Sequence, residues 1–104
     1  MLYVFEMANN HQGSLEHGLK IIDEFASLAK KNGLNAAIKF QFRQLDTFIH
    51  NDFKNSNLKY VKRFNSTRLS FDDFRVLAKS AKSKSLLTMA TPFDNESLSW
   101  IEEL

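Results

Sequence analysis

Two clusters of polar side chains stand where hydrophobic segments of this 104-residue chain end. The clusters comprise Glu6, Asn10 and His11 around the end of the first segment, and Lys39, Gln41 and Arg43 around the end of the second. In parallel sheets, ligand-binding groups collect at the carboxyl ends of the strands. The spacing therefore predicts a small-molecule site at one end of a sheet.

The charged residue on the second segment suits an anionic ligand. An ammonium group on an apolar strand is costly unless it meets an anion, so Lys39 favours a phosphate or carboxylate. Gln41 shares a strand face with Lys39, and its amide can both donate and accept hydrogen bonds. A structural alternative pairs Lys39 with Glu6 across adjacent strands. Both can hold at once.

The composition describes a small folded protein without cysteine chemistry. Hydrophobic residues make up 43% of the chain and ten of its residues are phenylalanine, which is enough apolar surface for a packed core. The absence of cysteine excludes disulfides and thiolate metal sites. A net charge of +2 is too small to indicate nucleic acid or an anionic membrane as a partner. We expect a cytoplasmic protein, because the apolar opening is too short for a signal peptide or a membrane span.

Strand and helix signals alternate along the chain. We expect strands over residues 2–7, 36–42 and 85–90, and helices over residues 14–32, 70–84 and 95–104. The unbroken hydrophobicity of the first segment predicts a strand buried on both faces. Ser14 is the expected N-cap of the first helix, Gly33 is expected to end that helix, and the second helix is expected to start at Ser70. The polar stretch 44–69 is long for a connection, which is typical of functional loops or of loops with short helices.

This order of elements predicts an α/β fold with right-handed parallel crossovers. The phenylalanines at positions 5, 40 and 42 alternate with the polar residues and are expected to point toward the helices as core. Three β/α units do not close a barrel, which needs eight units and about 250 residues. We therefore expect residues 1–104 to be the first three units of a TIM (β/α)8 barrel that is incomplete as given. The alternative is a small open sheet that a partner chain completes.

Three motifs occur in order at the expected strand ends: F-E-M-A-N-N-H-Q-G-S-L from Phe5, K-F-Q-F from Lys39, and T-P-F-D from Thr91. Together they resemble the N-terminal part of the sialic acid (N-acetylneuraminate) synthase family, NeuB-like. Members of that family condense phosphoenolpyruvate with an N-acetylated amino sugar, such as N-acetylmannosamine, to a nonulosonic acid and phosphate. The resemblance implies a transferase that forms a carbon-carbon bond in surface carbohydrate biosynthesis.

The same resemblance implies roles for individual residues. Glu6 and Gln41 match sugar-binding positions of the family, and Lys39 and Thr91 match positions that contact phosphoenolpyruvate. Asn10 and His11 match the N-H pair of the first motif and are expected to support the turn rather than to bind metal. Independently of the resemblance, the mixture of basic and aromatic residues from Tyr60 to Arg68 would suit a lid over an anionic substrate, with Arg43, Lys62, Arg63 or Arg68 as possible contacts.

Two positions depart from the family pattern, and one region does not align with it. Ala8 stands where the family has glycine, and no glycine follows Lys82 to Lys84, where the second helix is expected to end. The sugar-contacting asparagine of the family could be Asn51, Asn55, Asn57 or none of them, and the acceptor sugar stays open.

The resemblance also implies features beyond these residues. The family uses a divalent metal, manganese or magnesium, whose ligands we expect outside this chain, and we expect the full-length protein to be a homodimer. Residues 1–104 alone are therefore expected to be inactive. Two alternatives stay open, a non-catalytic β/α module that a partner chain completes and another phosphoenolpyruvate or aldolase-type barrel enzyme.

Overall fold

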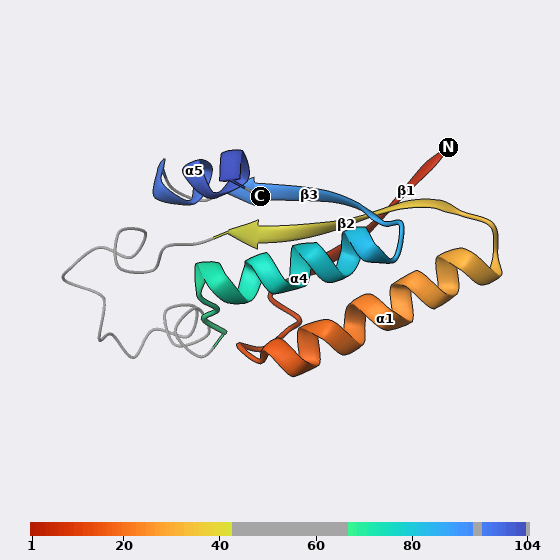
Figure 1. Ribbon diagram of the computed structural model, residues 1–104, viewed down its shortest axis with the longest axis horizontal. Coiled ribbons are helices and arrows are strands. Elements are labelled where there is room, and N and C mark those ends of the chain that lie inside the picture. Colours follow the sequence, from red (N-terminus) through yellow and green to blue (C-terminus); the bar gives the residue numbers. More distant parts are fainter. Residues whose placement is uncertain (43–66, 93–94, 104) are drawn as a thin grey trace.

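The computed structural model of the chain describes residues 1–42, 67–92 and 95–103. Within these ranges, three parallel strands form one sheet in the order β1-β2-β3, with a helix after each strand (Figure 1). The strands are β1 (Leu2–Ala8), β2 (Asn35–Phe42) and β3 (Leu87–Pro92), and the helices are α1 (Leu15–Lys31), α4 (Phe71–Ser83) and α5 (Asn95–Glu103). The alternation expected from the sequence is confirmed, while most of the stretch 44–69 lies outside the described residues.

Both ends of α1 are capped as expected. The Ser14 hydroxyl oxygen accepts a hydrogen bond from the His17 amide at 3.1 Å, which satisfies one of the free amides of the first turn. At the other end, Gly33 adopts a left-handed conformation with φ of 62°, and the Leu34 amide donates to the Ala29 carbonyl at 2.8 Å. Glycine is the residue that takes this conformation without steric cost, so the helix stops here.

Helix α4 begins with a reciprocal capping box. The Ser70 hydroxyl accepts from the Asp73 amide at 3.1 Å, and the Asp73 carboxylate accepts from the Ser70 amide at 3.4 Å. Two otherwise unpaired backbone donors are satisfied by this exchange. The expectation that a helix starts at Ser70 is confirmed.

The third strand is shifted from its expected position. It spans Leu87–Pro92 rather than residues 85–90. Ser85 has a φ of 63°, and the Leu86 amide still donates to the Ala81 carbonyl at 3.0 Å, so both residues complete the end of α4. A serine therefore occupies the left-handed position that glycine ordinarily fills, and pairing with β2 starts only after it.

The core lies between the helices and one face of the sheet. Phe5 of β1 stacks on Phe25 of α1 with ring centroids 4.6 Å apart, and Phe42 of β2 meets Phe74 of α4 at 4.9 Å. Trp100 of α5 adds a contact with Phe42 at 5.8 Å. All three helices thus pack against the side of the sheet to which these phenylalanines point, which confirms their expected place in the core.

Helices α1 and α4 approach each other closely at Gly18. A Cβ atom at this position would lie 2.9 Å from Leu77 Cδ2 of α4, which is closer than carbon atoms can approach. It would also lie 3.4 Å from Cβ of the buried His11. A side chain at position 18 would therefore require the end of the Leu77 side chain to shift.

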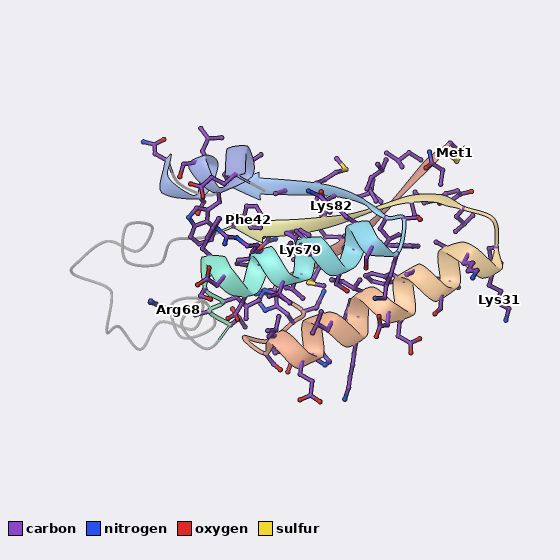
Figure 2. The ribbon with its side chains drawn as sticks, in the orientation of Figure 1. Met1, Lys31, Phe42, Arg68, Lys79 and Lys82 are labelled. Carbon is purple, nitrogen blue, oxygen red and sulfur yellow. The ribbon has the colours of Figure 1, made fainter. Side chains whose placement is uncertain are left out.

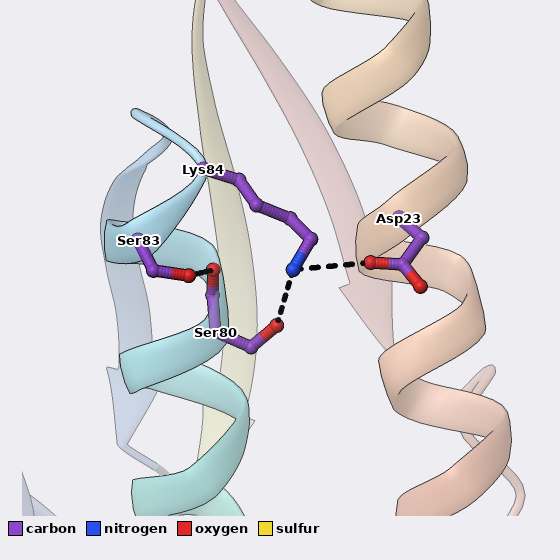
Figure 3. A network of polar contacts seen from close by, with 4 residues as sticks. All are labelled: Asp23, Ser80, Ser83 and Lys84. Carbon is purple, nitrogen blue, oxygen red and sulfur yellow. Dashed lines mark hydrogen bonds and ion pairs between the residues drawn. The ribbon is translucent and has the colours of Figure 1, made fainter.

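A polar network joins α1 and α4 near the C-terminal end of α4 (Figure 3). The Lys84 ammonium group lies 3.2 Å from a carboxylate oxygen of Asp23 and 3.3 Å from the Ser80 hydroxyl. Both charged side chains are partly exposed, so the pair contributes little to stability, about 0–1 kcal/mol. This end of the helices lies away from the carboxyl ends of the strands (Figure 1).

The opposite face of the sheet is uncovered by any described element. Its exposed apolar side chains are Leu2, Val4, Leu87 and Met89. Leu87 is 55% exposed, although it stands on a strand that is paired along its length with β2. The expectation that the first strand is buried on both faces is wrong for this structure, because β1 is an edge strand and only one face of the sheet carries helices.

The order of the strands decides between two kinds of α/β architecture. Right-handed crossovers between neighbouring strands in the order β1-β2-β3 place every helix on the same face, whereas a doubly wound sheet reverses its strand order and carries helices on both faces. The observed α/β arrangement is an open parallel sheet, consistent with a partial barrel-like unit. Among the described residues, no helix combines the length and the apolar character that a membrane span requires.

Candidate functional site

The strand register brings two polar pairs together on the uncovered face of the sheet. Phe40 and Phe42 point toward the helices, so Lys39 and Gln41 between and beside them point the other way. Lys39 is paired in register with Glu6 of β1, and Gln41 is paired with Thr91 of β3. The four residues that the sequence analysis singled out for substrate binding thus occupy neighbouring positions near the carboxyl ends of the strands.

Glu6 and Lys39 form an ion pair across the first two strands. The Lys39 ammonium nitrogen lies 3.6 Å from a Glu6 carboxylate oxygen, with 34% of the Lys39 side chain and 46% of the Glu6 side chain exposed. The interpretation of this pair as a structural contact is confirmed. Both groups remain partly accessible on this face of the sheet.

The backbone changes course directly after Glu6. The register of β1 against β2 shifts between Glu6 and Ala8, and Ala8 adopts a left-handed conformation with φ of 47°. A turn follows in which the Asn10 amide donates to the Met7 carbonyl at 2.9 Å. The irregularity shifts the ladder after Glu6, so that Ala8 pairs with Phe40, and the chain then leaves the sheet toward α1.

His11 is buried within this turn. Its Nδ1 accepts a hydrogen bond from the Gly13 amide at 3.0 Å, and its ring meets the edge of Phe74 with centroids 5.8 Å apart. An Nδ1 that accepts carries no proton, so the proton of the neutral ring is on Nε2. In this position His11 holds the turn against α4, and among the described residues no group of three His, Cys, Asp or Glu side chains could hold a metal ion.

Asn10 and Glu6 line a groove of about 380 Å³ between the end of β1 and helix α1. The apolar residues of its lining are Met7, Ile21 and Phe25, and its other lining residues are His17, Lys20 and Glu24 of α1. Asn10 itself is exposed. The groove runs along the edge of β1 that no described strand pairs, which makes it a place for a further structural element as much as for a ligand.

Met89 faces the site and was not singled out from the sequence. It is paired in register with Lys39 and is exposed on the uncovered face. Side chains two positions apart on a strand lie on the same face, so the sequence could have placed Met89 on the same face as Thr91. The site therefore has an apolar side chain beside its ammonium group.

The basic residues of the expected lid are mostly beyond the structural description. Arg43, Lys62 and Arg63 lie outside the described residues, as does the stretch with the candidate asparagines 51, 55 and 57. Arg68 is described and exposed, just before α4, whose first turn lies beside the carboxyl end of β2 (Figure 2).

An open parallel sheet with helices on one face places the chain in the β/α class, in which ligand sites generally lie at the carboxyl ends of the strands. A family model described as the NeuB family matches residues 25–104. The chain belongs to the NeuB family. This range contains Lys39, Gln41 and Thr91, while Glu6 and the turn after it precede it.

Solved structures are similar to this chain over nearly its whole length. The protein assigned as spore coat polysaccharide biosynthesis protein E in Chromobacterium violaceum is 42% identical with a TM-score of 0.92 over 98% of this chain. N-acetylneuraminic acid (sialic acid) synthetase from Leptospira borgpetersenii, solved with citrate, is 28% identical with a TM-score of 0.74 over 98% of this chain. The chain spans about a third of the length of either protein, 31% and 32%.

A third structure supports the fold alone. Spore coat polysaccharide biosynthesis protein SpsE from Bacillus subtilis is 22% identical with a TM-score of 0.63, and the match covers 98% of this chain and 26% of that one. No curated protein matches the chain.

Proposed function

We propose that this chain supplies the first three β/α units of an eight-unit barrel enzyme that condenses phosphoenolpyruvate with an N-acetylated amino sugar. The products are a nonulosonic acid and phosphate, as in sialic acid synthesis. The observation that carries the proposal is the register that sets Glu6 beside Lys39 and Gln41 beside Thr91 on one uncovered sheet face. Membership of the NeuB family supports it, and favours a synthase over an aldolase-type barrel enzyme.

The four residues divide between the two substrates by their chemistry. The Lys39 ammonium group and the Thr91 hydroxyl suit the negatively charged carboxylate and phosphate of phosphoenolpyruvate. The Glu6 carboxylate accepts hydrogen bonds from sugar hydroxyls, and the Gln41 amide both donates and accepts. Asn10 and His11 shape the turn beside Glu6. Arg68 stands at the same end of the sheet as a further cation for an anionic substrate.

In the reaction that we propose, the alkene carbon of phosphoenolpyruvate forms a bond to the aldehyde carbon of the open-chain sugar. Water adds to the carbon that carries the phosphate, and phosphate then leaves with its bonding electrons. The residues described in this chain bind and orient the two substrates. Holding two reactants at reacting distance converts a bimolecular step into an effectively intramolecular one, which accounts for a large share of catalysis in such enzymes.

The described residues do not fit the divalent metal that the family uses, because they contain no cluster of candidate ligands. We place the manganese or magnesium site of the assembled enzyme on residues outside this chain, and we attach no step of the reaction to it. A cytoplasmic homodimer remains our proposal for the assembled enzyme.

A chimera tests the proposed function. Residues 1–104 would replace the matching third of the Chromobacterium violaceum protein, which at 42% identity offers the most compatible packing surface of the three structures above. First, the unmodified Chromobacterium violaceum protein is assayed with a panel of N-acetylated amino sugars, which identifies the acceptor sugar that it uses. We expect the chimera to release phosphate from phosphoenolpyruvate only when that sugar is present. A folded chimera without such release, beside an active parent protein, contradicts the proposal.

A further inference from the structure

Two partners compete for the Lys39 ammonium group. Under the function proposed above, its ammonium group binds the anionic substrate, yet in the structure it lies 3.6 Å from the Glu6 carboxylate, which the proposed function assigns to the sugar. Glu6 and Lys39 are the only charged residues of the three described strands. The two substrate positions therefore share one ion pair.

The ion pair is weak enough for a ligand to exchange it. Both side chains are partly exposed, and exposed ion pairs are worth little in water because solvent screens them. Phosphoenolpyruvate carries more negative charge than a single carboxylate, so its anionic groups compete well for the ammonium group. Binding of the anion then draws Lys39 away from Glu6 without a large cost.

The carboxylate of Glu6 has two opposite effects on the substrates. It competes with the anionic substrate for Lys39, and its own negative charge repels that substrate. Once Lys39 has turned to the anion, both Glu6 oxygens become available as hydrogen-bond acceptors for sugar hydroxyls. Met89, which stands beside Lys39 in the register, brings no charge that could replace it.

We propose that the Glu6–Lys39 pair couples the two substrate sites, so that the anionic substrate raises the affinity for the sugar by releasing Glu6. This inference rests on the proposed function and adds a regulation of binding to it. Coupling between two ligands is reciprocal, so the sugar raises the affinity for the anion by the same factor. Because the factor cannot exceed what the pair itself is worth, we expect about two- to fivefold.

The test is an NMR titration of the isotope-labelled 104-residue chain with phosphoenolpyruvate, alone and with N-acetylmannosaminitol. This sugar alcohol has no aldehyde carbon and cannot react. The variants are Glu6→Gln and, as a matched control, Glu16→Gln, which removes the carboxylate of another Lys–Glu pair, at 3.7 Å on the surface of α1. The readouts are the amide signals of Lys39 and Gln41.

In the wild-type chain we expect phosphoenolpyruvate to shift the Lys39 signal, and the sugar alcohol to lower the titration midpoint about two- to fivefold. In Glu6→Gln the midpoint should fall even without the sugar alcohol, and the sugar alcohol should no longer change it. A gain in affinity cannot arise from misfolding. Glu16→Gln should behave as wild type.

Two other results separate the failure of this inference from the failure of the proposed function. If phosphoenolpyruvate shifts Lys39 but Glu6→Gln binds it equally or more weakly, or Glu16→Gln changes the midpoint equally, the coupling is wrong and the proposed function stands. If phosphoenolpyruvate leaves the Lys39 and Gln41 signals of the wild-type chain unchanged, the assignment of Lys39 to the anion is wrong and the coupling falls with it.

Discussion

Single residues at the end of β1 explain why the site forms where it does. Ala8 has a φ of 47°, a conformation that costs an alanine about 1–2 kcal/mol and a glycine almost nothing. The family resemblance marks this position as one for glycine, and the structure shows the left-handed backbone that would favour glycine there. The direction of the turn and the register shift beside Glu6 were visible only in the structure, because they depend on pairing with β2.

Replacement of Ala8 by glycine should raise the free energy of unfolding by up to about 1 kcal/mol, because relief of the left-handed strain exceeds the entropy that glycine gains in the unfolded chain. Urea denaturation measures the change. The same substitution at Ala26, within α1, is the control and should lower stability by about 1 kcal/mol. Equal losses at both positions would show that Ala8 is not strained.

His11 is of a residue type that often acts in catalysis or binds metal, but in this structure it supports the turn after β1. Its ring is fully buried, and its Nδ1 accepts from the Gly13 amide. We expect His11→Ala to lower the free energy of unfolding by about 2–4 kcal/mol, since it removes a buried ring and leaves a backbone donor without its acceptor. The exposed His17→Ala should cost less than about 0.5 kcal/mol in the same urea experiment. A loss of similar size at both positions would contradict the supporting role.

At the scale of elements, local signals determined the helix starts better than the strand limits. Ser14 and Ser70 cap their helices through bonds within three residues, so their sequence context was sufficient. The start of β3 depends on how α4 ends, and Ser85 in a left-handed conformation gives no sequence signal comparable to glycine. The burial of β1 depends on which elements cover the sheet, so it could not be predicted from the hydrophobicity of the strand itself.

The close approach of α1 and α4 predicts that a side chain added at Gly18 has to displace a neighbour on α4. Gly18→Val should lower the free energy of unfolding by about 1–3 kcal/mol, because the new side chain overlaps with the buried Leu77 and must displace it. Ser27→Val, on the exposed side of the same helix, controls for the low helix propensity of valine and should cost less than about 0.7 kcal/mol. Thermal or urea denaturation that ranks the two variants equally would show that the helices can move apart freely.

At the scale of the whole molecule, the uncovered sheet face relates the fold to the proposed site. Apolar side chains such as Val4 and Leu87 occupy its amino-terminal part, and the polar pairs lie toward the carboxyl ends of the strands. This gradient matches a barrel interior, in which a packed apolar base supports a ligand site at the open end. The sequence motifs predicted that polar residues stand at the carboxyl ends of the strands. The exposure of the apolar end followed only from the three-dimensional arrangement.

The cost of truncating Leu87 should depend on whether this face is covered. In the 104-residue chain, Leu87→Ala should lower the free energy of unfolding by less than about 1 kcal/mol, because the side chain is 55% exposed. In the chimera with the Chromobacterium violaceum protein, the same change should cost about 2–4 kcal/mol, as for a buried leucine. Urea denaturation of the 104-residue chain and of the chimera, each with and without Leu87→Ala, measures both costs. An equal small cost in both would mean that nothing packs on this face.

The most direct test of the account is the KM for phosphoenolpyruvate in that chimera with Lys39→Met, because it asks whether the ammonium group on the open sheet face binds the anionic substrate. Loss of a charged hydrogen-bond donor should raise this KM by about ten- to a hundredfold. The matched change Lys79→Met, at an exposed position on α4, should leave it unchanged (Figure 2). An active Lys39→Met chimera whose KM for phosphoenolpyruvate equals that of the Lys79→Met control would contradict the assignment of this site.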